Sequence, residues 1–216
     1  MSRAPRKKAA RKSPAERSAE IADAARDVAL EHGLYAVTLR AVAARIDVAP
    51  ALVAHYQPDM HALVASTFGA IVSAELDEVE ELVEPLPSPS ARLAVLLDTL
   101  LDGSRDDVTV VWVEAWAMGR RNEPLAAAVR EQMDAWQALV QQVVEDGAAR
   151  GEFEAEDPAD TAWQLLGMID GLNAHALVRW NADRSRGSAP HRAVEGMLGL
   201  PRFALDGAAA LTDRSA

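Results

Sequence analysis

Apolar residues recur at spacings of three and four along almost the whole chain, and this periodicity constrains the fold more than any other feature. The segment from about 123 to 150 shows it best, with apolar residues separated by 4, 4, 3, 4 and 3 positions (Leu125, Val129, Met133, Trp136, Val140 and Val143). An α-helix places such residues on one face. The sequence therefore predicts an all-α protein of about nine helices.

Capping and stop signals place the ends of these helices. Ser13, Pro14 and Glu16 have the pattern of a capping box, and Gly33 follows the helix that they begin. Asp157 and the proline after it begin another helix in the same way. Further helices are expected near 38–46, 50–58, 60–83, 89–103, 123–150, 158–182 and 190–207, the last interrupted at 199–201.

Residues 108–113 are the one ambiguous stretch. Their sequence, VTVVWV, is rich in β-branched residues, which favour strands. A single strand would have no partner elsewhere in the chain, however, and Trp112 and Trp116 share a helical face. We therefore predict a helix here as well.

Composition excludes several classes of protein. The 216 residues include no cysteine, which rules out disulfide frameworks and cysteine-based metal or catalytic sites. The apolar run at 93–101 is shorter than the ~18–20 residues that a membrane span needs, and no apolar segment follows the basic start as in a secretory signal. A cytoplasmic location without a membrane partner is expected.

The charge is distributed unevenly along the chain. The net charge of −11 combines +3 over residues 1–64 with −14 over residues 65–216. The first thirteen positions are strongly basic, and two interpretations are open: a solvated tail, or an arm along DNA phosphates or in a minor groove. The residues of this candidate arm are Arg6, Lys7, Lys8, Arg11 and Lys12.

Residues 38–56 have the pattern of a helix-turn-helix. Ala43 is small enough for two short helices to cross tightly, and Asp47 tolerates the left-handed backbone of the turn between them. Leu52 and Tyr56 are expected to face the core. The outward residues, which would enter the major groove, are then Ala49, Ala51, Ala54 and His55. A helical corner without a DNA-binding role is the alternative.

The front of the chain contains the stretches EHGLYAVTL, RAVAARIDV and HYQPDMHAL. Through them, residues 16–64 resemble the DNA-binding domain of the TetR family of bacterial transcription regulators. The stretches VWVEAWAMGRRNEPLAAAVRE and WQLLGMIDGLNAHAL are similar to the betaine-regulator-type branch. Together with the basic start, the resemblance divides the chain into a basic arm at 1–13, a helix-turn-helix domain expected at 14–64, and a ligand-binding and dimerisation domain expected at 65–216. It also implies a homodimeric, sequence-specific repressor that a small-molecule effector releases from operator DNA.

The chain departs from the family pattern at several positions. Asp47, Ala49, Ala54 and Met60 stand where the family commonly has a turn glycine, a capping serine, an aromatic residue and a phosphate-binding lysine. Small apolar side chains can still contact thymine methyl groups. A dimeric sensor of the same fold that has lost sequence-specific DNA binding is therefore a second hypothesis. Besides the arm, the candidate DNA contacts are Thr38, Arg40, Ala49, Pro50, Ala51, Ala54, His55 and Tyr56.

The C-terminal part is rich in tryptophan and methionine. Such side chains form ligand pockets between helices, although they are more often plain core. Polar residues within apolar helices favour a pocket, because a buried carboxylate needs a partner: an internal arginine, a second subunit or a cationic ligand. The candidate pocket residues are Trp112, Glu114, Trp116, Met133, Trp136, Trp163, Asp170 and Asn173.

The segments 158–182 and 190–207 are the expected dimer interface. The first is apolar on more sides than one neighbour can cover, and Gly167 and Gly171 allow a second helix to approach closely. The sequence contains no metal-binding histidine spacing, HExxH motif, phosphate loop or recognisable nucleophile motif. No metal, cofactor or catalytic site is therefore predicted, and an enzyme whose site is assembled from distant residues is the least favoured alternative.

Overall fold

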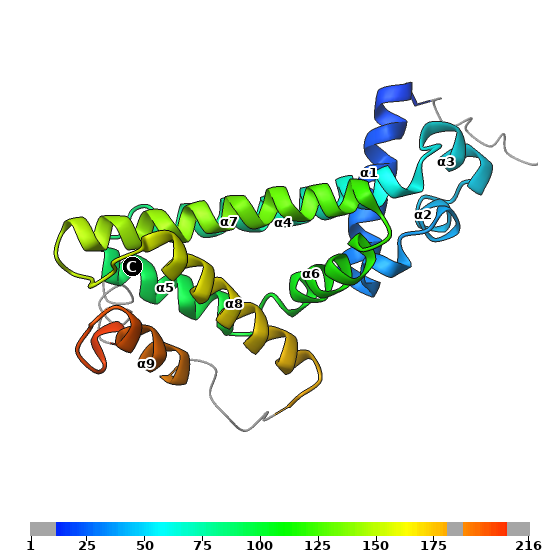
Figure 1. Cartoon of the computed structure of the whole chain (residues 1–216). Helices are drawn as coiled ribbons and strands as arrows, with labels where there is room; N and C mark the ends of the chain where they lie inside the picture. The colour runs from blue at the N-terminus through cyan, green and yellow to red at the C-terminus, as the bar shows by residue number, and fades with distance from the viewer. Residues whose placement is uncertain (1–11, 181–187, 207–216) are drawn as a thin grey trace, which may run out of the picture.

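The computed structural model describes residues 12–180 and 188–206, and the regular structure within these ranges is helical (Figure 1). It confirms the all-α fold class. The helices are α1 (Pro14–His32), the short 3-10 helix η1 (Leu34–Ala36), α2 (Leu39–Arg45), α3 (Pro50–Tyr56), α4 (Met60–Val83), α5 (Pro89–Leu101), α6 (Asp106–Gly119), α7 (Glu123–Ala149), α8 (Pro158–Leu177) and α9 (Ser188–Met197).

The helices begin where side chains cap them. The Glu16 N–H donates to Ser13 Oγ at 3.2 Å and the Ser13 N–H donates to the Glu16 carboxylate at 2.6 Å, so the expected capping box is present. Asp157 caps α8 by accepting a hydrogen bond from the Asp160 N–H at 3.0 Å. The β-branched stretch 108–113 lies within α6, as predicted, because its buried residues repeat at helical spacing (Val108, Val111 and Ala115).

Helices α1, α2 and α3 form a helix-turn-helix at one end of the molecule. Asp47 adopts the left-handed backbone that the turn requires, with φ of 52°. The residue that anchors α3 in the core is Val53, which is fully buried, and not Leu52, which lies outside the core cluster. The prediction that Leu52 faces the core was wrong, because the conformation of the turn after α2 decides which side of α3 is buried. Val53 shares its face with Tyr56, which packs against the core as expected.

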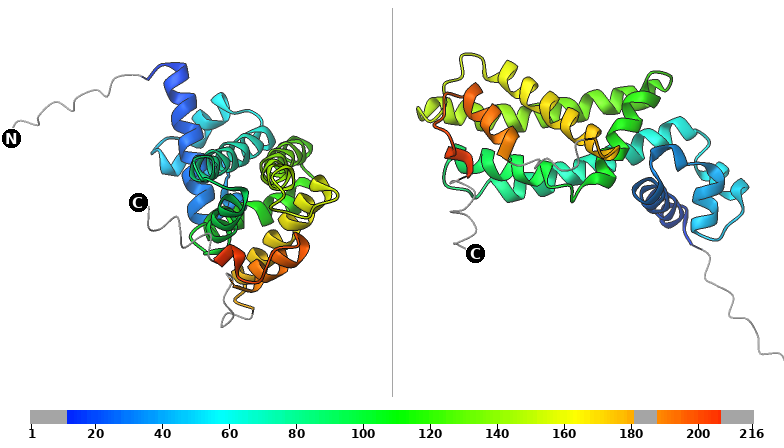
Figure 2. Two further views of the ribbon diagram at one scale, coloured as in Figure 1. Left: turned by 90° about the vertical axis from the view of Figure 1, so that its left-hand side faces the viewer. Right: turned by 90° about the horizontal axis from the view of Figure 1, so that it is seen from below.

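The remaining helices form an elongated bundle (Figures 1 and 2). Helices α4 and α7 lie side by side along its length, and α5, α6 and α8 pack against α7. Helix α6 also contacts α1 and η1, whereas α9 packs on α5 and α8 at the far end. One continuous core links Leu34 beside the helix-turn-helix to Leu198 at the far end. A displacement inside the bundle can therefore reach α1 through close-packed side chains.

One expected helix end differs from the structure. Helix α8 ends at Leu177 rather than near 182, whereas α9 ends at Met197, just before the interruption that the sequence predicts at 199–201. Gly199, with φ of 66°, and the proline two residues later end it, at the interruption that the sequence predicts. The domain boundary expected at residue 64 falls inside α4, which is a continuous helix.

A close contact between Gly147 and Phe153 gives a test of the bundle. A Cβ atom on Gly147 would lie 2.0 Å from Cδ2 of the Phe153 ring, which is 5% exposed. We expect Gly147→Ala to lower the free energy of unfolding by about 2 kcal/mol, because the buried ring must move. Urea denaturation measures the change. In the control, Gly69→Ala in α4, a Cβ meets nothing within 4 Å, so stability should be unchanged or slightly higher.

Candidate nucleic-acid interface and ligand pocket

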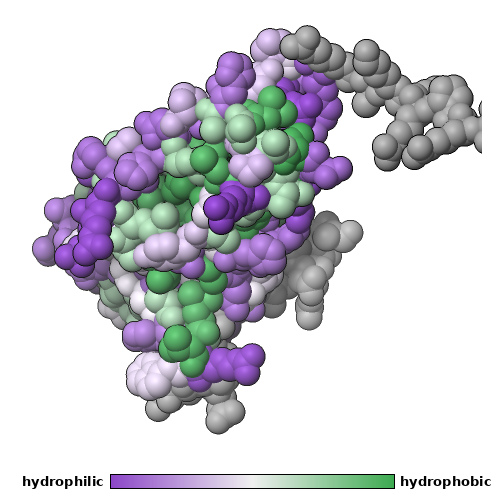
Figure 3. All heavy atoms as spheres, turned by 90° about the vertical axis from the view of Figure 1, so that its right-hand side faces the viewer, coloured by the Kyte–Doolittle hydropathy of each residue, from purple (hydrophilic) through white to green (hydrophobic). Residues whose placement is uncertain are grey.

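The predicted DNA contacts within the described residues lie mainly at the end of the molecule that carries α2 and α3. Figure 3 looks onto this end, where apolar and hydrophilic residues are intermixed over the surface. Ala54 and Tyr56 are half-buried, and Lys12 pairs with Glu20. The other arm residues, Arg6, Lys7, Lys8 and Arg11, lie outside the described ranges. The candidates with exposed side chains are Thr38, Arg40, Ala49, Pro50, Ala51 and His55.

The two arginines of α2 have different partners. Arg45 binds α1, with its guanidinium donating to Glu31 at 2.5 Å and to Asp27 at 3.0 Å. Arg40 is exposed and forms no ion pair within the described part of the chain. The only side-chain charge that α2 offers freely to a phosphate is therefore that of Arg40. Ala49 provides no side-chain cap for α3, as its residue type predicts.

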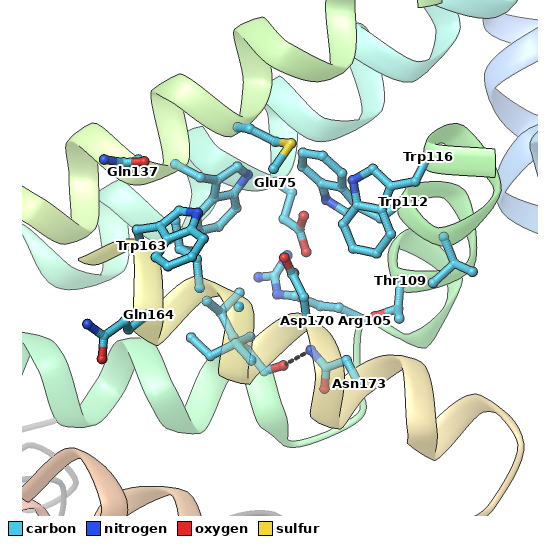
Figure 4. A pocket seen from close by; sticks show the side chains of 17 residues that line it. Glu75, Arg105, Thr109, Trp112, Trp116, Gln137, Trp163, Gln164, Asp170 and Asn173 are labelled. Atoms are coloured by element: carbon cyan, nitrogen blue, oxygen red, sulfur yellow. Dashed lines mark hydrogen bonds between the residues drawn. The ribbon is translucent and has the colours of Figure 1, made fainter. Parts of the chain in front are cut away.

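A cavity of about 380 Å³ lies between α6, α7 and α8, with residues of α4 and α5 at its inner wall. Figure 4 shows Trp112 and Trp116 on one side, Trp163 on the other, and Glu75, Arg105 and Asp170 between them. This volume suits a small organic molecule. Seven of the eight predicted pocket residues line it: Trp112, Trp116, Met133, Trp136, Trp163, Asp170 and Asn173.

Glu114, the eighth, does not line the cavity. It lies on the opposite side of α6, where its carboxylate accepts a hydrogen bond from the Tyr35 N–H at 2.9 Å. The same carboxylate packs against Gly33, where a Cβ would lie 2.7 Å from its oxygens. The place of Glu114 between two tryptophans in the sequence predicts a position in the pocket. Positions two apart on a helix face different directions, however, and Glu114 points toward η1 instead.

Two carboxyl groups in the cavity wall are largely desolvated. Burial raises the pKa of Glu75 to about 7, although the charge on Arg105 and a hydrogen bond from Trp112 act in the opposite direction. Burial also raises the pKa of Asp170 to about 6. Near neutral pH the cavity therefore holds one carboxylate and a second carboxyl that titrates, close to aromatic faces. This combination attracts a cation.

Several polar atoms in the same wall have no hydrogen-bond partner within the described residues: Arg105 Nε, Trp116 Nε1, Trp136 Nε1 and Asn173 Oδ1. The Asn173 amide does donate to the Leu100 carbonyl at 2.8 Å, which ties α8 to the last turn of α5. A buried polar atom without a partner costs about 1–3 kcal/mol. Several unpaired polar atoms in one cavity wall require an explanation, and a bound molecule that pairs with them provides one.

Comparison with known families decides the class of this protein. The family model "Bacterial regulatory proteins, tetR family" matches residues 21–67, which include the helix-turn-helix. The model "BetI-type transcriptional repressor, C-terminal" matches residues 89–199, more than half of the chain. The chain is a TetR-family transcriptional regulator with a BetI-type C-terminal domain. TetR regulators bind DNA and are not enzymes, so the exclusion of catalysis is confirmed.

Solved structures of transcriptional regulators share the fold. A transcriptional regulator from Saccharomonospora viridis in complex with choline is 19% identical, with a TM-score of 0.75 over 85% of this chain and 98% of that one. A TetR regulator from Haloarcula marismortui is 22% identical, with a TM-score of 0.70 over 86% and 97%. One from Rhodococcus sp. is 19% identical, with a TM-score of 0.71 over 85% and 99%. No curated protein sequence matches this regulator.

Sequence reasoning missed two central residues of the cavity. Glu75 follows Phe68 and Val72 on the buried stripe of α4 at spacings of four and three, so an acid on an apolar stripe was a signal that could have found it. Arg105 precedes α6 in a connecting segment, and nothing in the sequence places it beside Glu75.

Within the described ranges, none of the helices of this regulator combines the length and hydropathy of a membrane span.

Proposed function

We propose that this TetR-family regulator is a homodimeric repressor that a small organic cation releases from operator DNA. The cation binds in the cavity between α6, α7 and α8. It shifts the population toward a spacing of the two helix-turn-helix units that no longer fits adjacent major grooves. The basic arm adds phosphate contacts and minor-groove contacts beyond the recognition helix.

The observation that carries this proposal is the double role of α6. One side of the helix supplies Trp112 and Trp116 to the cavity, and another side holds Glu114 against the backbone of η1. Residue 36 at the end of η1 is followed within two residues by Thr38, which caps α2 with its hydroxyl oxygen. A ligand that displaces α6 therefore pulls on the segment that positions the helix-turn-helix. The two sites are coupled if the ligand prefers one position of α6.

The chemistry of the cavity favours an organic cation as effector. Faces of Trp112 and Trp116 adjoin the carboxyl groups of Glu75 and Asp170, the combination that binds quaternary ammonium groups elsewhere. The regulator from Saccharomonospora viridis, which has the same fold, was solved with choline. Choline is therefore the first effector to test on this protein.

Helices α8 and α9 are proposed as the dimer interface, over the expected segments 158–182 and 190–207. Only Ala162, Leu165 and Ile169 of α8 are buried in the single chain. Large apolar side chains near these helices remain exposed to solvent, which favours burial against a second copy. Apart from Trp163, which lines the cavity, they are Val178, Trp180 and Phe203.

DNA binding and release can be tested in one titration. Fluorescence anisotropy should show tight binding to the duplex upstream of the protein's own gene, and weaker binding to a scrambled duplex at two salt concentrations. Choline should then lower the affinity for the first duplex. Equal, steeply salt-dependent binding to both duplexes would favour the second hypothesis, a sensor of the same fold without sequence-specific recognition.

Substitutions at Arg40 and His55 separate affinity from specificity. Arg40→Ala is expected to weaken binding to all duplexes by a similar factor and to lower the slope of log K against log salt by about one, because one phosphate contact is lost. His55→Ala should instead change which bases are preferred near the centre of each half-site. Anisotropy against a set of duplexes with single base changes measures both. An equal loss on every duplex would contradict the role of His55.

A further inference from the structure

A second cavity adjoins the proposed effector pocket on the side of the helix-turn-helix. It measures about 340 Å³, and charged residues from three elements line it: Arg26 of α1, Glu78 of α4, and Asp107 at the start of α6. Glu75 and Arg105 line both cavities. These two residues therefore form the wall between the effector pocket and the first helix of the DNA-binding part.

Arg105 is held at one end only. Its Nη1 donates to Glu78 Oε2 at 3.0 Å, on the side of the second cavity. Its Nε is buried without a partner in the described part of the molecule. Figure 4 shows the Arg105 side chain between Glu75 and Asp170. No ion pair within 4.0 Å joins it to either carboxylate in the described ranges. The guanidinium can thus leave the pocket without breaking its bond to Glu78.

We propose that Arg105 is the counter-charge of Glu75 in the empty pocket and that a bound organic cation replaces it there. The displaced guanidinium keeps its hydrogen bond to Glu78 and turns further into the second cavity, toward Asp107 and Arg26 of α1. Arg105 is therefore both a competitor of the effector and the part that transmits its binding. This inference rests on the proposed function, because it requires a cationic effector.

Electrostatics explains why the two cations exclude each other. Two like charges in one poorly solvated cavity repel strongly, whereas each is attracted to the same carboxylate. Glu78 is exposed, and Asp107 lies at the N-terminus of α6, so both can accept a guanidinium at little desolvation cost. Moving a positive charge toward Arg26 disfavours the present contact between α1 and α6. The effector thereby obtains a differential affinity for the two arrangements, which any allosteric release requires.

The test uses the full-length protein and two probes of nearly the same shape. Choline carries the charge, and 3,3-dimethylbutan-1-ol is its uncharged carbon analogue. Tryptophan fluorescence measures the Kd of each probe, since four tryptophans line the pocket (Trp112, Trp116, Trp136 and Trp163). Anisotropy of the operator duplex measures release. The variants are Arg105→Gln and, as a matched control, Arg120→Gln, which is exposed at the other end of α6.

We expect Arg105→Gln to bind choline about tenfold more tightly than the wild type, because the competing charge is gone. Its affinity for the neutral analogue should stay within about twofold of the wild-type value. At saturating choline this variant should remain on DNA, whereas the wild type and Arg120→Gln are released. A loss of affinity that is equal for both probes, or release that matches the wild type, would overturn the proposal.

Glu78→Gln gives a second, independent readout. It removes the carboxylate that holds Arg105 on the side of the second cavity, so we expect choline binding to persist while release requires about tenfold more choline. Two failures can be told apart. If neither the wild type nor Arg105→Gln binds choline, the cationic effector is wrong and this inference falls with it. If the wild type binds and is released but the variants behave like it, the proposed function stands and only the role of Arg105 is refuted.

Discussion

Replacing Gly33 by alanine is expected to lower the free energy of unfolding by about 3 kcal/mol and to weaken the link between pocket and helix-turn-helix. Gly33 has φ of 86° and ψ of 163°, a region that is essentially restricted to glycine. A Cβ there would also lie 2.7 Å from both carboxylate oxygens of Glu114. The alanine must therefore strain the backbone and displace the carboxylate from the Tyr35 N–H.

Urea denaturation at fixed protein concentration measures this loss of stability. Two further variants separate the backbone strain from the steric contact with Glu114. Gly151 also has a positive φ, 70°, but a Cβ there meets nothing within 4 Å, so Gly151→Ala should cost only about 1 kcal/mol. The double variant Gly33→Ala with Glu114→Ala should regain part of the loss, since the steric conflict is relieved. Strict additivity of the two substitutions would mean that Glu114 does not press on Gly33.

Local signals predicted most of the fold. The capping box at Ser13 and Glu16 and the left-handed residue Asp47 follow from short-range chemistry, and the structure contains both. The rotation of α3 could not be predicted in the same way. Whether Leu52 or Val53 enters the core depends on how the turn after α2 directs the next helix, and both residues are apolar.

The sequence could predict only those pocket residues whose direction follows from apolar spacing along a single helix. Tryptophans on α6, α7 and α8 face a common space because their spacing orients them inward, as with Trp112 and Trp116. The charged centre depends on which helices become neighbours. Glu75 and Arg105 are thirty positions apart in the sequence and line one cavity because α4 packs against α6. Glu114 was misplaced because proximity in sequence to two tryptophans does not fix the direction of a side chain.

The affinity for choline is expected to depend on pH through the Glu75 carboxyl. A cation binds the ionised carboxylate, and burial raises the pKa of Glu75 to about 7 and that of Asp170 to about 6. We therefore expect the Kd for choline to be more than tenfold higher at pH 5.5 than at pH 8, because both carboxyls are largely protonated at the lower pH. Glu75→Gln should bind choline weakly throughout and show a much smaller pH dependence. A wild-type Kd that is constant between these pH values would contradict this.

The Glu75 carboxyl should affect stability in the opposite direction, because it favours folding at low pH but favours cation binding at high pH. A raised pKa means that the folded state binds the proton more tightly than the unfolded state, so this group favours folding below pH 4.5 and loses that contribution as the pH rises through 7. At pH 8, Glu75→Gln is therefore expected to stabilise the protein by about 2–3 kcal/mol, since an amide can still accept the hydrogen bond from Trp112. The control Glu81→Gln, at an exposed position of α4, should change stability little at any pH. A buried carboxylate that lowers the stability of the empty protein and binds a cation contributes to ligand binding rather than to folding. If Glu75→Gln instead destabilises the protein at pH 8, the attraction between Glu75 and the charge on Arg105 outweighs the cost of burial, and Glu75 is a structural residue rather than part of the effector site.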